Sequence, residues 1–300
     1  MKRRALLASM LVGALPSAVA RADVQGLESS ELALVELSLV GDPAFGRALL
    51  AVPRPLPPRP ELLVLLHGLG ETKAQELGAR AFAERYGMLS AVRRLTHPPL
   101  ARTEPKADYF GEGRLGELNE RLARRPFRCP VLVCPFTPNP YKPGGDEVLK
   151  RFARFASGRL KSAVEEQVGV AFPASRSMIC GVSLGGYLAI EVFLSNPEVF
   201  CALGTAQAAF GPNQATRYAA AVAAATARVG RRRVEVLTSS FDPYRRSNEL
   251  FGRHLRERKQ AVSVRVSPGP HDQRWLKESG VIEMLLSADD VFGERRAESP

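Results

Sequence analysis

The stretch that most constrains the fold is 177–194, SMICGVSLGGYLAIEVFL, in which a serine between glycines interrupts an apolar run. The residues before Gly181 have the continuous apolar pattern of a buried strand, and those after Ser183 have helical spacing. A serine at such a turn needs small neighbours two positions away on either side, so that strand and helix can pass closely. Gly181 and Gly185 meet that need. The pattern therefore predicts a nucleophile elbow that presents Ser183 at the edge of a sheet.

Strand-like and helical segments alternate over most of the remaining chain. Short apolar runs predict strands at 32–40, 44–52, 61–67, 130–136, 176–182, 200–206, 233–238 and 262–266. Helical periodicity covers 74–92, 114–125, 147–168, 184–195, 213–229, 244–259 and 273–287. This rhythm predicts an α/β protein with a mostly parallel sheet covered by helices on both faces.

Three segments interrupt the rhythm. The first two strands are separated by Gly41-Asp42-Pro43, which indicates a hairpin, and 53–60 (PRPLPPRP) has the composition of an extended connector. Residues 93–128 contain the irregular stretch HPPLARTEPKADYF and are long for a loop in a compact domain. We therefore expect one domain over 23–300, with an insertion at about 93–128.

The N-terminal residues 1–22 have the composition of an export signal. The basic Lys2-Arg3-Arg4 is followed by a short apolar segment, by Pro16 and by small residues that suit a signal peptidase. A twin-arginine signal and an ordinary secretory signal both fit, and a frayed basic helix is the alternative. We expect an exported protein, periplasmic or extracellular, and no transmembrane helix, because no run of about 18 apolar residues occurs.

The chain is basic, with a formal net charge of +11 that includes four basic residues of the 1–22 segment. Arginine runs at 231–233 and 253–259 have the patterns of the start of a strand and the exposed face of a helix. Binding to nucleic acid or to an anionic envelope surface is the alternative for these runs. We expect no nucleic-acid partner.

Four cysteines, Cys129, Cys134, Cys180 and Cys201, lie without any CxxC spacing. An even number in an exported protein permits disulfides, whereas their apolar surroundings equally suit buried free thiols. Both possibilities stay open. No clustering of partners indicates a metal site, and no cofactor is expected.

A serine nucleophile needs a general base, and the chain has only four histidines. His271 follows the last predicted strand, at the same edge of the sheet as Ser183, and is the expected base. His67 is expected to fix its loop by hydrogen bonds, His97 lies in the insertion, and His254 lies on a polar helix.

The base needs an acid to orient it, and Asp242 directly follows a predicted strand at that edge. Capping of the next helix is the alternative role for Asp242. Asp272 is adjacent to the histidine and badly placed to reach it, and Glu249 lies within a helix. The backbone N–H groups of Leu69 and Leu184 are the expected oxyanion hole.

Together these motifs resemble the α/β-hydrolase superfamily over nearly the whole chain after the signal segment. The resemblance is carried by HGLGE (67–71), GVSLGG (181–186), Asp242 and PHDQRW (270–275). Within the superfamily, Asp272 and Trp275 resemble the esterase D and feruloyl-esterase-like branch. The resemblance implies an eight-stranded, mostly parallel sheet and acyl-enzyme hydrolysis without a cofactor. Tyr109, Phe110 and Trp275 are candidate walls of the substrate site.

The sequence therefore predicts an exported serine esterase that acts on a small-molecule or polymer-linked ester, with Ser183, Asp242 and His271 as catalytic residues. An acyltransferase or peptidase with the same fold, or a non-catalytic envelope-binding protein, are the alternatives. Oligomeric state and substrate specificity stay open.

Overall fold

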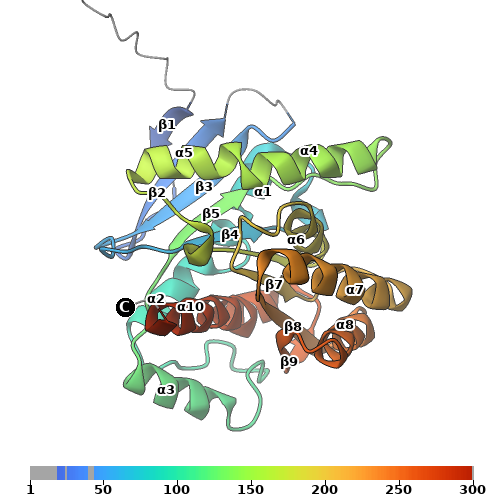
Figure 1. The fold of residues 1–300 in the computed structure, drawn as a ribbon. Helices are drawn as coiled ribbons and strands as arrows, with labels where there is room; N and C mark the ends of the chain where they lie inside the picture. The colour runs from blue at the N-terminus through green and yellow to red at the C-terminus, as the bar shows by residue number, and fades with distance from the viewer. Residues whose placement is uncertain (1–18, 24–25, 40–43, 299–300) are drawn as a thin grey trace, which may run out of the picture.

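A computed structural model describes residues 19–23, 26–39 and 44–298 of the chain (Figure 1). In these ranges nine strands form one sheet in the order β1-β2-β3-β5-β4-β6-β7-β8-β9. The strands are β1 (Val19–Asp23), β2 (Leu32–Leu39), β3 (Arg47–Pro53), β4 (Leu62–Leu66), β5 (Val131–Pro135), β6 (Ser177–Val182), β7 (Ala202–Ala206), β8 (Arg233–Phe241) and β9 (Ala261–Pro270). Strands β1, β2, β3 and β5 pair antiparallel, and β5, β4, β6, β7, β8 and β9 pair parallel.

The eight strands expected from the sequence correspond to β2–β9. Strand β1 is additional, pairs with β2 at the edge, and consists mostly of residues within the predicted signal segment. The rest of that segment and the predicted Gly41-Asp42-Pro43 hairpin lie outside the described residues. The α/β class and the mostly parallel sheet are confirmed.

Helices cover both faces of the sheet, as Figure 1 shows. One buried cluster joins α1, α2, α3 and α10 to one face, and a second joins α4–α8 to the other. The helices are α1 (Gln75–Glu84), α2 (Met88–Thr96), α3 (Arg114–Arg124), α4 (Gly145–Ser157), α5 (Arg159–Val168), α6 (Leu184–Ser195), α7 (Pro212–Val229), α8 (Arg245–Glu257), the short α9 (Gln273–Trp275) and α10 (Val281–Glu298). Two short 3₁₀ turns, η1 (Leu69–Glu71) and η2 (Ala174–Arg176), and a π turn, η3 (Leu276–Gly280), complete the described elements. No helix in the described ranges is long and apolar enough to cross a membrane.

Two helices predicted as continuous are each divided in two. The 74–92 helix is broken before Gly87, whose φ of +79° is left-handed and therefore ends the regular helix. The 147–168 helix is broken at Gly158, between α4 and α5. In both cases a glycine provides the bend, which apolar periodicity alone does not reveal.

The 93–128 insertion is tied to the C-terminal part of the chain by ion pairs. Arg114 donates two hydrogen bonds of 2.7 Å to the buried Glu283, and Arg121 pairs with the buried Asp289 at 2.6 Å. The buried Glu278 accepts a hydrogen bond of 2.8 Å from the Thr103 backbone N–H. The insertion is therefore a packed part of the domain.

All four cysteines are buried free thiols. Burial raises the pKa of Cys201 to about 11 and that of Cys180 to about 12, so both stay protonated near neutral pH. Of the two possibilities that the sequence left open, the structure contains the free thiols.

Candidate active site

Ser183 lies at the junction between β6 and α6 in a strained conformation. Its φ of 55° and ψ of −119° are uncommon for a residue with a side chain, and such strain is concentrated at functional sites. A Cβ on Gly181 would lie 2.2 Å from the Gly185 carbonyl oxygen, and one on Gly185 would lie 2.1 Å from that of Leu66. The two glycines are therefore required by close backbone approach, as the Gly-x-Ser-x-Gly pattern predicts.

The structure brings together the three side chains selected from the sequence. His271 Nε2 lies 2.9 Å from Ser183 Oγ, and His271 Nδ1 lies 2.8 Å from Asp242 Oδ1. Ser183, Asp242 and His271 follow the parallel strands β6, β8 and β9, whose carboxyl ends meet at one edge of the sheet. This is the geometry of a nucleophile, a base and an orienting acid.

Asp242 is held by hydrogen bonds with one oxygen facing the histidine. It is 6% exposed, and its other oxygen accepts a hydrogen bond of 2.5 Å from Thr238 Oγ1. Its Oδ1 also accepts from the Tyr244 backbone N–H at 3.0 Å. This contact lies just before α8, whose first turn has no side-chain cap, so the alternative capping role is not seen. The Tyr244 ring packs edge-on against the imidazole, with centroids 5.7 Å apart.

The other candidate acids and bases make different contacts. Asp272 accepts a hydrogen bond from the Trp275 backbone N–H at the start of α9, and Glu249 pairs with an arginine of its own helix. His97 is exposed, and His254 pairs with Glu257 on α8.

The expected oxyanion donors occupy the starts of two helical segments. Leu69 begins η1 and Leu184 begins α6. The N–H groups in the first turn of a helix lack partners within the helix and attract negative charge. Within the described ranges, neither N–H has an acceptor in the protein. Both are therefore available to an oxyanion.

A buried network that the sequence did not predict holds the loop before Leu69. The Gly68 backbone N–H donates a hydrogen bond of 3.1 Å to the Tyr86 hydroxyl, which in turn donates to the Glu71 carboxylate. Tyr86 and Glu71 are each 3% exposed. Tyrosine at this position carries no sequence signal, because within the predicted 74–92 helix it has the pattern of any core aromatic.

His67 fixes the same loop from its other side. Its Nε2 accepts a hydrogen bond of 2.8 Å from the Thr137 N–H, which leaves Nδ1 to donate to the Gly68 carbonyl at 2.8 Å. Burial lowers the pKa of His67 to about 4, so it is neutral at neutral pH. Its expected loop-fixing role agrees with these contacts.

Gln207 is a second residue that sequence reasoning missed. It is 1% exposed, has a φ of 49°, and follows β7 at the catalytic edge. Its Nε2 donates to Ser239 Oγ at 2.6 Å and to the carbonyl of Pro270, next to His271, at 2.9 Å. Its Oε1 has no partner in the described part of the chain. Gln207 thus braces the histidine loop from a strained backbone position.

The three candidate wall residues are a wrong prediction. Trp275 is fully buried and donates a hydrogen bond from Nε1 to Ser267 Oγ at 2.8 Å. Tyr109 and Phe110 are buried in the core of the insertion. Instead, a cavity of about 270 Å³ above Ser183 is lined by Gly68, Leu69, Gly70, Glu71, Tyr86, Val182, Gln207, His271, Asp272, Gln273 and Leu276. An aromatic side chain in the sequence suits a buried core position as well as the lining of a substrate site, so residue type alone did not distinguish the two.

Comparison with known proteins gives likeness in structure only. No protein-family profile matches the sequence, and no curated protein matches it significantly. A ferulic acid esterase superposes with a TM-score of 0.57 at 18% identity, covering 82% of this chain and 92% of its own. An S-formylglutathione hydrolase from Staphylococcus aureus superposes with a TM-score of 0.53 at 16% identity, covering 87% and 98%. A ferulic acid esterase from Anaeromyces mucronatus gives 0.57 at 11% identity, covering 90% and 95%. These likenesses establish that the chain has the α/β-hydrolase fold.

Proposed function

We propose that this protein is a serine hydrolase that cleaves carboxylic esters through an acyl-enzyme on Ser183. The observation that carries the proposal is the continuous contact from Ser183 Oγ to His271 and on to the buried Asp242. The strained elbow and the two free N–H groups of Leu69 and Leu184 support it. The structural neighbours named as esterases support the choice of ester chemistry.

In the proposed reaction, Ser183 Oγ attacks the ester carbonyl carbon while His271 Nε2 takes its proton. The imidazolium is held by Asp242, and the N–H groups of Leu69 and Leu184 stabilise the oxyanion. Collapse of the tetrahedral intermediate breaks the ester C–O bond, and His271 gives its proton to the leaving alcohol. Water then attacks the acyl-enzyme by the same route and releases the acid.

The site favours short acyl groups. Its cavity of about 270 Å³ is smaller than typical ligand pockets, which measure about 300–1,000 Å³. Leu69 at the rim is 46% exposed, which gives the rim an apolar contact for a small acyl or alcohol group. We therefore expect faster hydrolysis of p-nitrophenyl acetate and butyrate than of longer esters.

The test compares wild-type protein with Ser183→Ala on a series of p-nitrophenyl esters and with a fluorophosphonate probe. We expect wild type to hydrolyse the short esters and to be labelled, and S183A to do neither. Absence of both turnover and labelling in folded wild-type protein would remove the proposal. Release of the acyl group to an added alcohol in preference to water would indicate an acyltransferase instead.

We also propose export, on the basis of residues 1–22 alone. N-terminal sequencing of protein recovered outside the cytoplasm should show cleavage after residue 20 or 22. An uncleaved chain that stays in the cytoplasm would contradict this proposal without affecting the catalytic one.

A further inference from the structure

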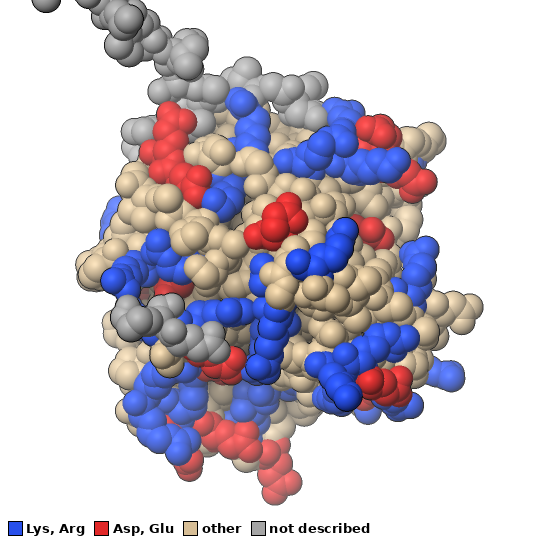
Figure 2. All heavy atoms as spheres, in the orientation of Figure 1, with Lys and Arg blue, Asp and Glu red and all other residues tan. Residues whose placement is uncertain are grey.

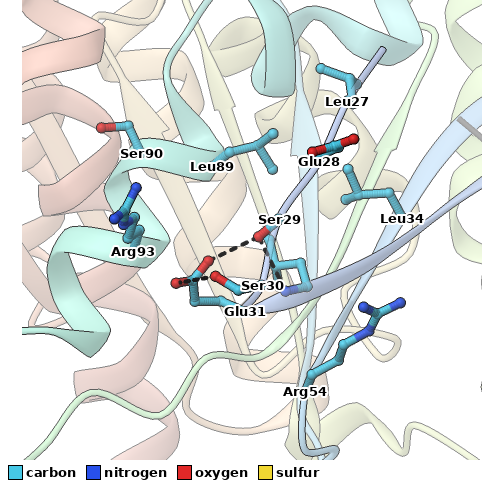
Figure 3. Close-up of a pocket in the computed structure, with 11 residues that line it drawn as sticks. Leu27, Glu28, Ser29, Ser30, Glu31, Leu34, Arg54, Leu89, Ser90 and Arg93 are labelled. Carbon is cyan, nitrogen blue, oxygen red and sulfur yellow. Dashed lines mark hydrogen bonds between the residues drawn. The ribbon is translucent and has the colours of Figure 1, made fainter. Parts of the chain in front are cut away.

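Three hollows on the molecule adjoin one another through shared lining residues. The first, of about 790 Å³, lies between the segment that precedes β2 and helix α2, and Figure 3 shows Arg54 and Arg93 on different sides of it. The second, of about 470 Å³, shares Ser30, Glu31 and Arg54 with the first. The third, of about 700 Å³, shares Arg128 with the second. We call these three hollows together the arginine groove.

The arginine groove lies at the edge of the sheet opposite Ser183. Arg176 directly precedes β6, and Arg59 and Arg128 lie three positions before β4 and β5, at the ends where these parallel strands begin. Arg54 directly follows β3, which runs antiparallel to β5 and therefore ends at the same edge. Ser183 lies at the carboxyl end of β6. The groove is thus separate from the catalytic cavity.

The lining of the groove is strongly basic, and its cations are all arginines. Three glutamates share the groove, of which Glu31 accepts hydrogen bonds from two serines and Glu61 pairs with Arg296 at 2.8 Å. The lining contains no lysine, and its arginines are Arg54, Arg59, Arg93, Arg128, Arg176, Arg295 and Arg296. Figure 2 shows that basic and acidic side chains are mixed on the face of the molecule seen in Figure 1.

Four of these guanidinium groups have no partner among the residues that the structure describes. Arg54, Arg59, Arg93 and Arg128 are exposed, and none pairs with an acid or hydrogen-bonds through its side chain in the described part of the chain. Arginine carries a planar fork of donors that matches a carboxylate in two parallel hydrogen bonds. Unpaired guanidinium groups in a hollowed surface therefore point to an anionic ligand.

The proline-rich connector 53–60 restricts the backbone at two of these four arginines. Arg54 and Arg59 each lie between prolines in PRPLPPRP, and proline restricts the backbone of such a segment. Fixing the backbone in advance reduces the entropy lost when a ligand binds. This gives the connector a binding role in addition to joining β3 to β4.

We propose that the arginine groove binds an acidic polysaccharide, a chain of sugars that carries carboxylates at intervals. A linear chain fits a row of hollows, and its carboxylates match the separated arginines. Proteins that recognise a nucleic-acid duplex insert a helix or a β-ribbon into one of its grooves, whereas this surface is concave. Single-stranded nucleic acid needs exposed rings for its bases. Of the residues that line the hollows, His97 alone offers an exposed aromatic ring in the described part of the chain, and a single ring does not provide stacking positions for successive bases.

The test uses fluorescein-labelled polygalacturonate and fluorescence anisotropy, at low salt and at about 0.15 M ionic strength. Arg54→Gln with Arg128→Gln removes the two unpaired charges that join the hollows. Arg253→Gln with Arg256→Gln removes two exposed charges from α8 and is the matched control. We expect R54Q/R128Q to weaken binding at least about tenfold, equivalent to the loss of about 1.4 kcal/mol. The control should change binding by less than about twofold.

Three results would overturn the proposal. They are the absence of saturable binding by wild type, equal losses in both pairs of variants, and tighter binding of a DNA oligonucleotide that depends on Arg54 and Arg128. Neutral dextran should not compete with polygalacturonate. Hydrolysis of p-nitrophenyl acetate by R54Q/R128Q should equal that of wild type, because the groove and the catalytic cavity share no residue. The proposal therefore stands or falls separately from ester hydrolysis.

Discussion

Replacing Tyr86 by phenylalanine removes one hydroxyl from the network behind the oxyanion loop. That hydroxyl accepts the hydrogen bond of the Gly68 N–H and donates to the Glu71 carboxylate. The aromatic ring, which packs edge-on against Phe82 with centroids 5.1 Å apart, is retained in Tyr86→Phe. The variant therefore tests the hydrogen bonds and leaves the packing in place.

The expected loss follows from what the variant leaves unpaired. A buried polar group without a partner costs about 1–3 kcal/mol, so the free energy of unfolding should fall by at least that amount. Gly68 directly precedes Leu69, and loosening it misdirects the Leu69 N–H that we propose binds the oxyanion. Complete loss of one such donor lowers kcat by about 10²–10³-fold. Because Y86F misplaces the donor without removing it, kcat should fall by about 10–100-fold with little change in KM.

The chain contains a matched control in Tyr218, another buried tyrosine that donates to a carboxylate. Its hydroxyl lies 2.5 Å from Oε1 of Glu191 on α6, and neither Tyr218 nor Glu191 lines the cavity. Tyr218→Phe should lower the free energy of unfolding by a similar amount and leave kcat unchanged. Urea unfolding and p-nitrophenyl acetate kinetics on both variants separate the two effects. Unchanged kcat in Y86F, or an equal loss in Y218F, would refute the positioning role.

Three further predictions test the elbow, the buried histidine and the acid. Gly185→Ala should lower the free energy of unfolding by about 3 kcal/mol or more, because its Cβ would meet the Leu66 carbonyl. Gly116→Ala is the control: this glycine lies in open space on α3, and its replacement should be neutral or slightly stabilising in the same urea unfolding assay. The pKa of His67 is lowered from 6.5 to about 4, so the unfolded chain takes up a proton that the folded chain does not as the pH falls through that range. The free energy of unfolding should therefore fall by up to about 3 kcal/mol between these pH values, and by less in His67→Gln; identical pH profiles would contradict this. Asp242→Asn should lower kcat by about 10³–10⁴-fold with little change in melting temperature, and activity within tenfold of wild type would exclude Asp242 as the orienting acid.

Local sequence was sufficient for the elements and for the elbow. The apolar runs of β4, β5 and β6 are buried on both faces of the sheet, so their composition predicts them directly. Gly181 is required because the Gly185 carbonyl, four residues later, approaches it closely, and Gly185 because the Leu66 carbonyl in the adjacent strand does. The short Gly-x-Ser-x-Gly motif is therefore enough to predict both positions. Because the histidines are few, elimination also selected His271 without knowledge of the strand order.

Contacts between distant segments were not predictable in this way. Trp275 was expected to line the substrate site, but it lies in the buried core, where it is in one cluster with residues of the insertion. The residues next to Trp275 in the sequence do not predict this packing. Tyr86 and Gln207 have ordinary sequence contexts, and their roles depend on Gly68 and Pro270, 18 and 63 residues away.

The sequence by itself determined the alternation of strands and helices, the strained serine and the residues able to serve it, because backbone geometry and apolar burial act over a few residues. Only the tertiary structure decided which side chains meet, because that depends on the strand order β5-β4-β6-β7-β8-β9, which no local pattern encodes. The same order places the carboxyl ends of the strands around Ser183. At the opposite ends of the strands, the same order brings together the arginines of the arginine groove, which lie between Arg54 and Arg296 in the sequence.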